Sequence, residues 1–271
     1  MQISVLIPSR GRPLSLMETV IGLSVKASRL HDVRYVIGCD ADDDGTIAMA
    51  LSLRQGGLPV FPRVGVRPSS LGGLVNQLAE KYPADVYCSW GDDVRVVTDG
   101  WDGVIADAWT KKPDGIWWWC CAKDATFAIV SEKWRAASGR IFTDYFPFWY
   151  DDIWLIEVQR YATGRKGDRI DVWLDDKAPA THRMRDLKDW NDFFWSRRDE
   201  RRAEAAAIAE KLGWPKVENL DALDLGVNPA FDTAAMEAIQ AKQGERAPPT
   251  PEYLAAYTRM KELMQQQKEA A

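Results

Sequence analysis

The stretch ISVLIPSRGRP (Ile3–Pro13) sets the architecture of this chain. Residues 3–8 form a short apolar run, which is typical of a strand buried on both faces of a parallel sheet. The polar loop SRGR follows at once, and a helix is predicted over 14–30. A buried strand, a polar loop and a covering helix are the parts of an α/β layer, so this segment predicts the start of a parallel sheet.

The same order of elements repeats along the first half of the chain. VRYVIGCDADDDGT predicts a second strand over 34–39, followed by a helix over 47–54, and PVFPRVGV predicts a third strand. PSSLGGLVNQLAEKY predicts a helix with Ser69 or Ser70 as its N-cap, and ADVYCSW predicts a fourth strand. This alternation predicts a three-layer α/β domain with a mostly parallel sheet.

Polar loops follow the first, second and fourth predicted strands. Their sequences are SRGR, DADDDGT and GDD. Ligands of open α/β sheets bind at the carboxyl ends of the strands, near the point where the strand order reverses. We therefore expect these three loops to converge on one rim and to form the functional site.

The second half is less regular. GIWWWCCAK, ATFAIVS and RIDVWLDD predict strands, and helices are predicted over 132–138 and 151–162, the latter ending at Gly164. From residue 189 onward the sequence is mainly helical, which favours a boundary near residue 190. The last predicted helix carries an apolar stripe that could dock on the core or on a partner subunit. The stripe consists of Tyr253, Tyr257, Met260 and Met264.

Composition excludes several classes of protein. The chain has 271 residues, a net charge of −5 and 46% hydrophobic residues, so it is globular and has no overall attraction to nucleic acid. Four cysteines without a C-x-x-C pair and two histidines make a structural zinc site an unlikely fit and favour a reducing, cytoplasmic setting. No apolar window approaches ~20 residues, so no membrane span is expected, and the N-terminal run is interpreted as a strand rather than a signal peptide.

Each polar loop supports a chemical interpretation and a plain one. Adjacent carboxylates such as Asp92 and Asp93 repel each other unless a cation or donors stabilise them, and Mg²⁺ and Mn²⁺ prefer oxygen ligands. The plain alternative is a solvated turn. The acidic loop after the second strand lacks the closing Glu of an EF-hand, which excludes an EF-hand calcium site. The plain alternative to a ligand-binding role for this loop is an Asx-turn. Arg10 and Arg12 can bind phosphate through their guanidinium groups, and the alternative is that both are solvated surface residues. The sequence contains neither the glycine motif of a dinucleotide-binding fold nor that of a P-loop.

Taken in order, ISVLIPSRGRP, VIGCDADDDGT and SLGGLVNQLAEKYPADVYCSWGDDVRVVTDGWD resemble the inverting nucleotide-sugar glycosyltransferases of the GT-A fold, family 2, including phage-type members. The resemblance covers about residues 1–185. It implies a Rossmann-like α/β/α domain over 1–188, with a donor half (1–100) and an acceptor half (101–188). Residues 189–271 would then be a helical C-terminal extension.

The resemblance also implies a donor site for a UDP- or GDP-type sugar nucleotide and a divalent metal, Mn²⁺ or Mg²⁺. In that family the first-strand motif surrounds the nucleotide, an aspartate closing the second strand reads the base, and a D-x-D-type motif holds ribose and metal. The signature is compressed to GDD here, which leaves open which aspartate binds metal. The residues implied as nucleotide contacts are Pro8, Ser9, Arg10, Arg12, Asp40, Asp42, Asn76 and Asp92, and the implied metal ligands are Asp93 and Asp92.

In the acceptor half, YDDIWLIEVQRYATG is similar to the acidic pair that opens a helix in that family, with Asp-Asp in place of the commoner Glu-Asp. It implies that Asp152, or else Asp151, is the general base that takes the acceptor proton. The alternative is that both only favour the helix N-terminus. His182 is implied as a further metal ligand, against a structural role. Trp101, Trp118 and Trp149 are the candidate walls of the sugar or acceptor pocket, because indole rings stack on flat apolar faces.

The acceptor stays open between a glycan, a small molecule and a hydroxymethylated base of phage DNA. Residues 182–202 mix seven Arg or Lys with five Asp or Glu among aromatics, which suits either nucleic acid or a solvated helix face. Two other functions compete with transfer. One is a nucleotidyltransferase that makes the sugar nucleotide, whose Gly-rich entry loop is missing. The other is a non-catalytic binding protein on the same scaffold.

Overall fold

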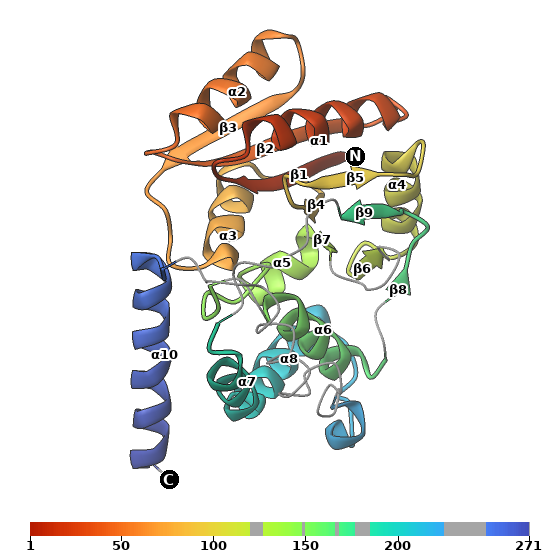
Figure 1. Ribbon diagram of the computed structural model, residues 1–271. Coiled ribbons are helices and arrows are strands. Elements are labelled where there is room, and N and C mark those ends of the chain that lie inside the picture. The colour runs from red at the N-terminus through yellow and green to blue at the C-terminus, as the bar shows by residue number, and fades with distance from the viewer. Residues whose placement is uncertain (120–126, 148–149, 166–167, 177–184, 225–247, 271) are drawn as a thin grey trace.

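The computed structural model describes residues 1–119, 127–147, 150–165, 168–176, 185–224 and 248–270. Within them, seven strands form one sheet in the order β3-β2-β1-β4-β7-β6-β8 (Figure 1). Strands β3, β2, β1 and β4 are parallel, whereas β7 is antiparallel to both β4 and β6. The sheet strands are β1 (Gln2–Ser9), β2 (Asp32–Asp40), β3 (Val60–Gly65), β4 (Val86–Ser89), β6 (Ile116–Trp119), β7 (Phe127–Ser131) and β8 (Asp168–Arg169).

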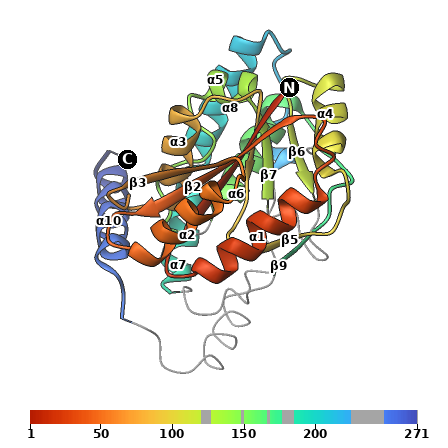
Figure 2. The ribbon, with the colours of Figure 1, turned by 90° about the horizontal axis from the view of Figure 1, so that it is seen from above.

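Helices cover both faces of the sheet, as the three-layer prediction requires. One face packs against α1 (Pro13–Lys26), α2 (Asp44–Gln55) and α4 (Trp101–Lys111), and the other against α3 (Leu71–Lys81), α5 (Glu132–Ser138) and α6 (Asp151–Thr163). Seen from above, α1 and α2 lie over the parallel strands (Figure 2). Each face has its own apolar core, and β1 contributes to both because nearly all of its side chains are buried.

Some predicted boundaries are wrong for identifiable reasons. Helix α1 ends at Lys26 rather than at residue 30, because the backbone N–H and hydroxyl of Ser28 both donate to Asp102 at 2.6 Å and draw the chain out of the helix. The late strand predicted from RIDVWLDD is split. Its first part lies in β8, and its last part forms β9 (Leu174–Asp176), which pairs with β5 (Val94–Val96) in a separate two-stranded sheet.

The C-terminal helices pack on the α3–α5–α6 face rather than forming a separate core. Helices α7 (Leu187–Ser196) and α8 (Arg198–Leu212) share one hydrophobic cluster with α5 and α6. The Arg201 guanidinium is fully buried, 2.5 Å from Glu157 on α6 and 3.8 Å from the centre of the Phe194 ring. If α8 moved away from α6, this buried ion pair would break and leave an uncompensated charge. The contact therefore holds α8 against α6.

The last helix, α10 (Pro251–Ala270), docks on α7 through the predicted apolar stripe. Tyr253 and Met260 are buried, and the Tyr253 and Tyr257 rings both contact Trp190. The stripe therefore packs on the chain's own core, which is one of the two partners predicted for it. In Figures 1 and 2, α10 lies at the edge of the molecule, on the β3 side of the sheet.

Gly72 allows α3 to approach the segment between α5 and α6. A Cβ atom at this position would lie 2.1 Å from the carbonyl oxygen of Thr143, closer than any such contact can be. Because the neighbouring atom belongs to the backbone, the strain cannot be relieved by a side-chain rotation. Gly22, inside α1, has no atom within 4 Å of the equivalent position.

We predict that Gly72→Ala lowers the free energy of unfolding by about 1–3 kcal/mol through overpacking. Gly22→Ala is the matched control and should raise it by about 0.5–1 kcal/mol, because alanine loses less conformational entropy in a helix. Urea denaturation of both variants measures the difference. Equal effects of the two substitutions would contradict the close approach of α3 to Thr143.

Candidate active site

The strand order reverses between β1 and β4, and the polar loops that follow these two strands meet there. The Ser9 hydroxyl donates to Oδ2 of Asp92 at 2.7 Å, and Arg12 forms ion pairs with both Asp92 and Asp93, the latter at 2.6 Å. Asp92 is fully buried, and its backbone carbonyl accepts from Thr19 of α1 at 2.9 Å. One guanidinium thus pairs with both adjacent carboxylates of the GDD motif, which leaves one net negative charge.

Gly91 is needed for the position of Asp93. A Cβ atom on Gly91 would lie 2.5 Å from Oδ1 of Asp93, so any larger residue would displace the carboxylate. Asp93 keeps about a fifth of its side chain accessible, whereas Asp92 has none exposed. Of the two carboxylates, Asp93 is therefore the more accessible to a ligand.

The acidic loop after β2 is divided between two tasks. Arg10 donates to Asp40 at 2.9 Å and grips Asp42 through both nitrogens, which lowers the pKa of Asp42 to about 2. Asp43 instead caps α2 by accepting from the backbone N–H of Thr46 at 3.1 Å, and it also accepts from the Gly11 backbone N–H at 2.6 Å. Only the first part of the loop is thus turned toward the first-strand arginines.

A cavity of about 330 Å³ opens beside these residues. Its walls come from the β1 loop, the end of β2, the β3–α3 connection with the first turn of α3, and the start of α10. Ser70 caps α3 through the Gly73 N–H at 2.9 Å, so the positive end of this helix points to the cavity. The lining includes Pro8, Ser9, Arg10, Arg12, Asp40, Arg67, Ser69, Ser70, Leu71, Arg185, Thr250, Glu252 and Tyr253.

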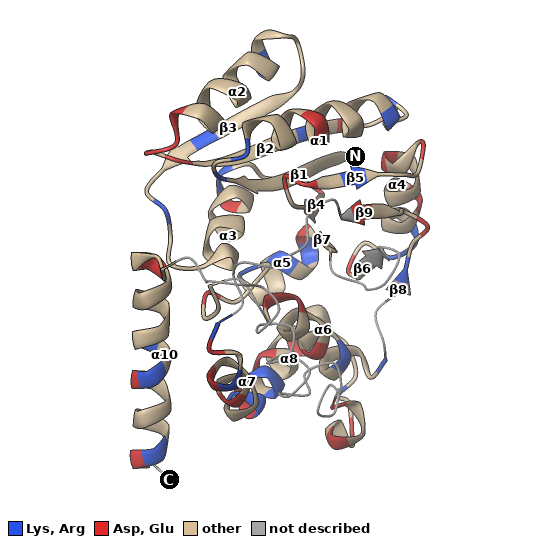
Figure 3. Ribbon diagram, viewed as in Figure 1, with Lys and Arg blue, Asp and Glu red and all other residues tan. Residues whose placement is uncertain are grey.

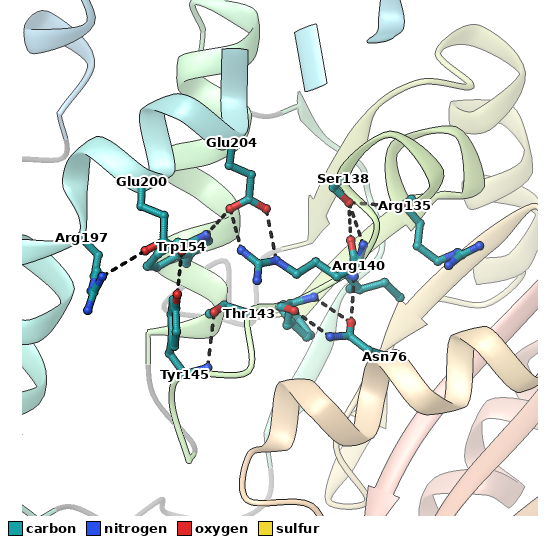
Figure 4. A network of polar contacts seen from close by, with 12 residues as sticks. Asn76, Arg135, Ser138, Arg140, Thr143, Tyr145, Trp154, Arg197, Glu200 and Glu204 are labelled. Atoms are coloured by element: carbon teal, nitrogen blue, oxygen red, sulfur yellow. Dashed lines mark hydrogen bonds and ion pairs between the residues drawn. The ribbon is translucent and has the colours of Figure 1, made fainter. Parts of the chain in front are cut away.

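Asn76 is not among the residues that line this cavity, and neither are Asp42, Asp92 and Asp93, so the predicted nucleotide or metal contacts of these four residues stay predictions. Its side-chain oxygen accepts from the backbone N–H groups of Ile141 and Phe142 at 2.8 and 3.1 Å, and its NH₂ donates to the Phe142 carbonyl at 2.8 Å (Figure 4). The amide is therefore engaged in tying α3 to the segment that precedes α6. The same segment leads to Asp151 and Asp152, so Asn76 supports these two residues only indirectly.

The same segment is also held from the C-terminal side. Glu204 of α8 pairs with Arg140 at 2.8 Å and accepts from the Trp154 indole N–H at 2.8 Å, while Glu200 accepts from the Tyr145 hydroxyl at 2.8 Å (Figure 4). The start of α6 is thus fixed by α3 on one side and α8 on the other.

The predicted acidic pair opens α6 as expected, in two different environments. Asp151 is buried, and burial raises its pKa well above the ordinary value, with the charge of Asp152 adding to the effect. Asp152 is half-buried and accepts from the backbone N–H of Ile153 at 2.8 Å. Pro147 lines the cavity, whereas Asp151 and Asp152 are not among its lining residues.

The other predicted site residues fall into two groups. Trp101 is fully buried, donates to the Leu23 carbonyl at 3.0 Å and packs on Trp90, so the prediction that it lines a sugar or acceptor pocket is corrected to a core role. Trp118 lies in β6, but its side chain is outside the described part of the structure, as are Trp149 and His182. Their predicted roles stay predictions.

The donor chemistry of the GDD aspartates fits a divalent cation that arrives with a ligand. Within the residues described, no group of three or more His, Cys, Asp or Glu side chains converges as a metal site. Mg²⁺ is commonly bound by one or two carboxylates together with phosphate oxygens and water. Asp93 is accessible and next to Asp92, so it can supply a carboxylate ligand of this kind.

The basic stretch near residue 190 is largely neutralised within the chain. Positions of basic and acidic residues are mixed along α7 and α8 (Figure 3). Its described ion pairs include Lys188–Asp192, Arg197–Glu200, Arg198–Asp224, Arg201–Glu157 and Arg202–Asp221. This arrangement matches the solvated helix face rather than a surface with a strong positive field. No helix in the described ranges is long and apolar enough to cross a membrane.

Sequence reasoning missed several cavity residues. Arg67 follows the third strand, in a loop that was not considered with the other three strand ends, although the same rule of strand ends applies to it. Arg185, Thr250, Glu252 and Tyr253 reach the cavity from the C-terminal third of the chain. No local pattern could have placed them there.

Comparisons with known proteins match this architecture. No protein-family model and no curated protein sequence matches the chain. Among solved structures, a mannosyltransferase from Pyrobaculum calidifontis in complex with GDP-Man and Mn²⁺ superposes with a TM-score of 0.54 at 14% identity, over 97% of this chain and 84% of that one. The chain has the GT-A fold.

Two further structures show the same fold. Glucosyl-3-phosphoglycerate synthase from Mycobacterium tuberculosis, in complex with Mg²⁺ and UDP, matches with a TM-score of 0.50 and 15% identity, over 79% of this chain and 80% of that one. TarS from S. aureus in complex with UDP matches with a TM-score of 0.51 and 10% identity, over 66% of this chain and 59% of TarS. The chain therefore spans less than two thirds of the TarS chain that it matches.

The raised pKa of Asp151 predicts a pH-dependent stability. A carboxyl group whose folded pKa is raised contributes stability below its unfolded value of about 3.9, and this stability is lost as pH rises through the folded pKa. Asp151→Asn stays neutral, so we expect it to melt higher than wild type at pH 7–8 and equally near pH 4. Each unit of raised pKa corresponds to about 1.4 kcal/mol.

Thermal unfolding across this pH range measures the effect. Asp107→Asn, at an exposed position of α4, is the control and should leave the pH profile unchanged. A constant difference between Asp151→Asn and wild type at every pH would mean that folding does not raise the pKa of Asp151, which would contradict the prediction.

Proposed function

We propose that this chain is a glycosyltransferase that moves a sugar from a nucleoside-diphosphate sugar to a hydroxyl acceptor, with inversion at the anomeric carbon. The observation that supports it most is the arrangement at the reversal point of the GT-A fold. There Arg10, Arg12 and Asp40 line one cavity, and ion pairs connect Arg12 to both Asp92 and Asp93. This combination offers cationic groups for a diphosphate and carboxylates for a base, a ribose and a metal.

The surroundings of Asp40 favour a uracil base. Arg10 approaches its carboxylate at 2.9 Å and Arg67 at 3.7 Å, so one acceptor lies between two donors. The imide edge of uracil presents the complementary order, in which an N–H donor lies between two carbonyl acceptors. Guanine presents two adjacent donors beside one acceptor, which this pattern matches less well. A UDP-sugar is therefore the preferred donor.

The diphosphate would lie beside the first-strand arginines and the N-terminus of α3. Guanidinium groups bind phosphate through two parallel hydrogen bonds, and a helix N-terminus favours an anion. Arg10 and Arg12 are partly exposed and paired with aspartates in the structure, so a diphosphate can compete for them at the cavity surface. Asp93, with Asp92 behind it, would hold the divalent cation. Bound there, the cation would neutralise charge on the departing diphosphate.

The reaction requires one base opposite the leaving group. The acceptor oxygen attacks the anomeric carbon, the bond from that carbon to the diphosphate oxygen breaks, and the acceptor proton passes to a carboxylate. Asp152 suits this role better than Asp151, because burial favours the protonated form of Asp151. The nucleoside diphosphate leaves with the bonding electrons, which gives a single displacement with inversion.

The acceptor is proposed only as a hydroxyl compound, in the classes of glycan, small molecule or hydroxymethylated DNA base. The ion-paired arginines of α7 and α8 give little support to DNA. A nucleotidyltransferase and a non-catalytic nucleotide-binding protein remain the competing functions, and both are separated from transfer by turnover of a sugar nucleotide.

We predict that UDP with Mn²⁺ raises the melting temperature, that GDP with Mn²⁺ raises it less, and that Mn²⁺ alone has little effect. Saturating ligand at 100 times its Kd stabilises a protein by about 2.7 kcal/mol. Asp93→Asn should remove the metal-dependent part of the shift, whereas Asp107→Asn should behave as wild type. The absence of any nucleotide effect on wild type would refute the proposed donor site.

We predict that Asp152→Asn lowers the rate of UDP-sugar hydrolysis, with water as acceptor, about 10²- to 10⁴-fold, because a general base is lost. The Kd for UDP should not change. Asp151→Asn is the matched variant and should retain most of the activity. If Asp151→Asn is the inactive variant and Asp152→Asn the active one, the roles of the two aspartates are reversed.

A further inference from the structure

The first turn of α10 forms part of the cavity wall, although it lies at the far end of the sequence from the strand loops. Thr250 caps this helix, since its hydroxyl accepts from the Tyr253 N–H at 3.3 Å and its carbonyl from the Leu254 N–H at 3.0 Å. Pro251 occupies the first helical position, where its missing N–H costs nothing. Glu252 and Tyr253 then line the cavity together with Thr250.

Tyr253 anchors this turn firmly. Its hydroxyl donates to Asp186 at 2.6 Å and accepts from the Trp190 indole N–H at 3.2 Å. Further along the helix, Lys261 pairs with Asp189 at 2.7 Å, and Gln267 donates to the Ser196 carbonyl at 3.0 Å. The helix is thus attached to α7 along most of its length, and the residue preceding Tyr253 has little freedom to move.

That residue, Glu252, connects α10 to the base-binding end of the cavity. Its carboxylate lies 3.5 Å from Nη1 of Arg67, whose Nε lies 3.7 Å from Asp40. Arg67 is about one third exposed and follows an edge strand, and the carboxylates of Glu252 and Asp40 both lie near its guanidinium. Without Glu252, the nearer of these two ion pairs is lost, and the remaining distance to Asp40 allows other rotamers of Arg67.

We propose that Glu252 is a positioning residue of the donor site, which holds Arg67 beside Asp40 so that both can meet the nucleobase. This inference rests on the proposed function and extends it, because it makes the C-terminal helix part of the substrate site. The pKa of Glu252 is lowered by a hydrogen bond from its own backbone N–H, with further contributions from the Thr250 hydroxyl and Arg67. The carboxylate is therefore ionised at neutral pH and attracts the guanidinium.

The test is a double-mutant cycle with isothermal titration calorimetry of UDP in the presence of Mn²⁺. Glu252→Gln should raise the Kd for UDP about three- to fivefold, the effect of a partly exposed ion pair. Glu262→Gln, at an exposed position of the same helix, is the control and should leave the Kd unchanged. In an Arg67→Ala background, Glu252→Gln should have no further effect, because the group through which it acts is gone.

A second nucleotide locates the effect. UMP and UDP share the base but differ in phosphates, so Glu252→Gln should weaken both by the same factor. A loss confined to UDP, an effect equal to that of Glu262→Gln, or full additivity with Arg67→Ala would overturn the proposal. Wild-type protein that binds no UDP would instead refute the donor site itself, which keeps the two failures distinguishable.

Discussion

The ion pair of Arg12 with Asp92 and Asp93 is the contact on which the site depends. It joins the loop after β1 to the loop after β4, about 80 positions apart in the chain and adjacent in the sheet. Asp92 is fully buried, so its charge requires Arg12 and the Ser9 hydroxyl for compensation. The motif that could bind a ligand is therefore also part of what fixes the two strand ends, and a ligand cation would add to the compensation that Arg12 and Ser9 provide.

Around this point the C-terminal helices provide support that a minimal α/β sheet would lack. Glu204 and Glu200 on α8 fix the segment that leads to Asp151 and Asp152, and α10 brings Glu252 to Arg67. The donor side and the proposed base are thus each held by residues from beyond position 186. The region predicted as an appended extension shares the core of the domain, and the start of α10 forms part of the cavity wall.

The sequence allowed the sheet and the strand-end residues to be predicted, because apolar runs such as that of β1 and the polar residues that end them are local signals. The same rule placed Asp40, Asp92 and Asp93 on one rim. Trp101 was misjudged because residue type does not show which face of a helix packs inward. Contacts such as Glu252 with Arg67 depend on how distant helices pack, which no local pattern encodes.

The most direct test of the account is a crystal structure with UDP and Mn²⁺. We predict that the uracil lies against Asp40, with Arg10 and Arg67 on either side, that the diphosphate lies beside Arg12 and Arg10, and that the metal is bound at Asp93, with Arg12 shifted from its pairing with that residue. A nucleotide bound elsewhere, or bound here with Asp93 still paired to Arg12 and no metal, would contradict the account.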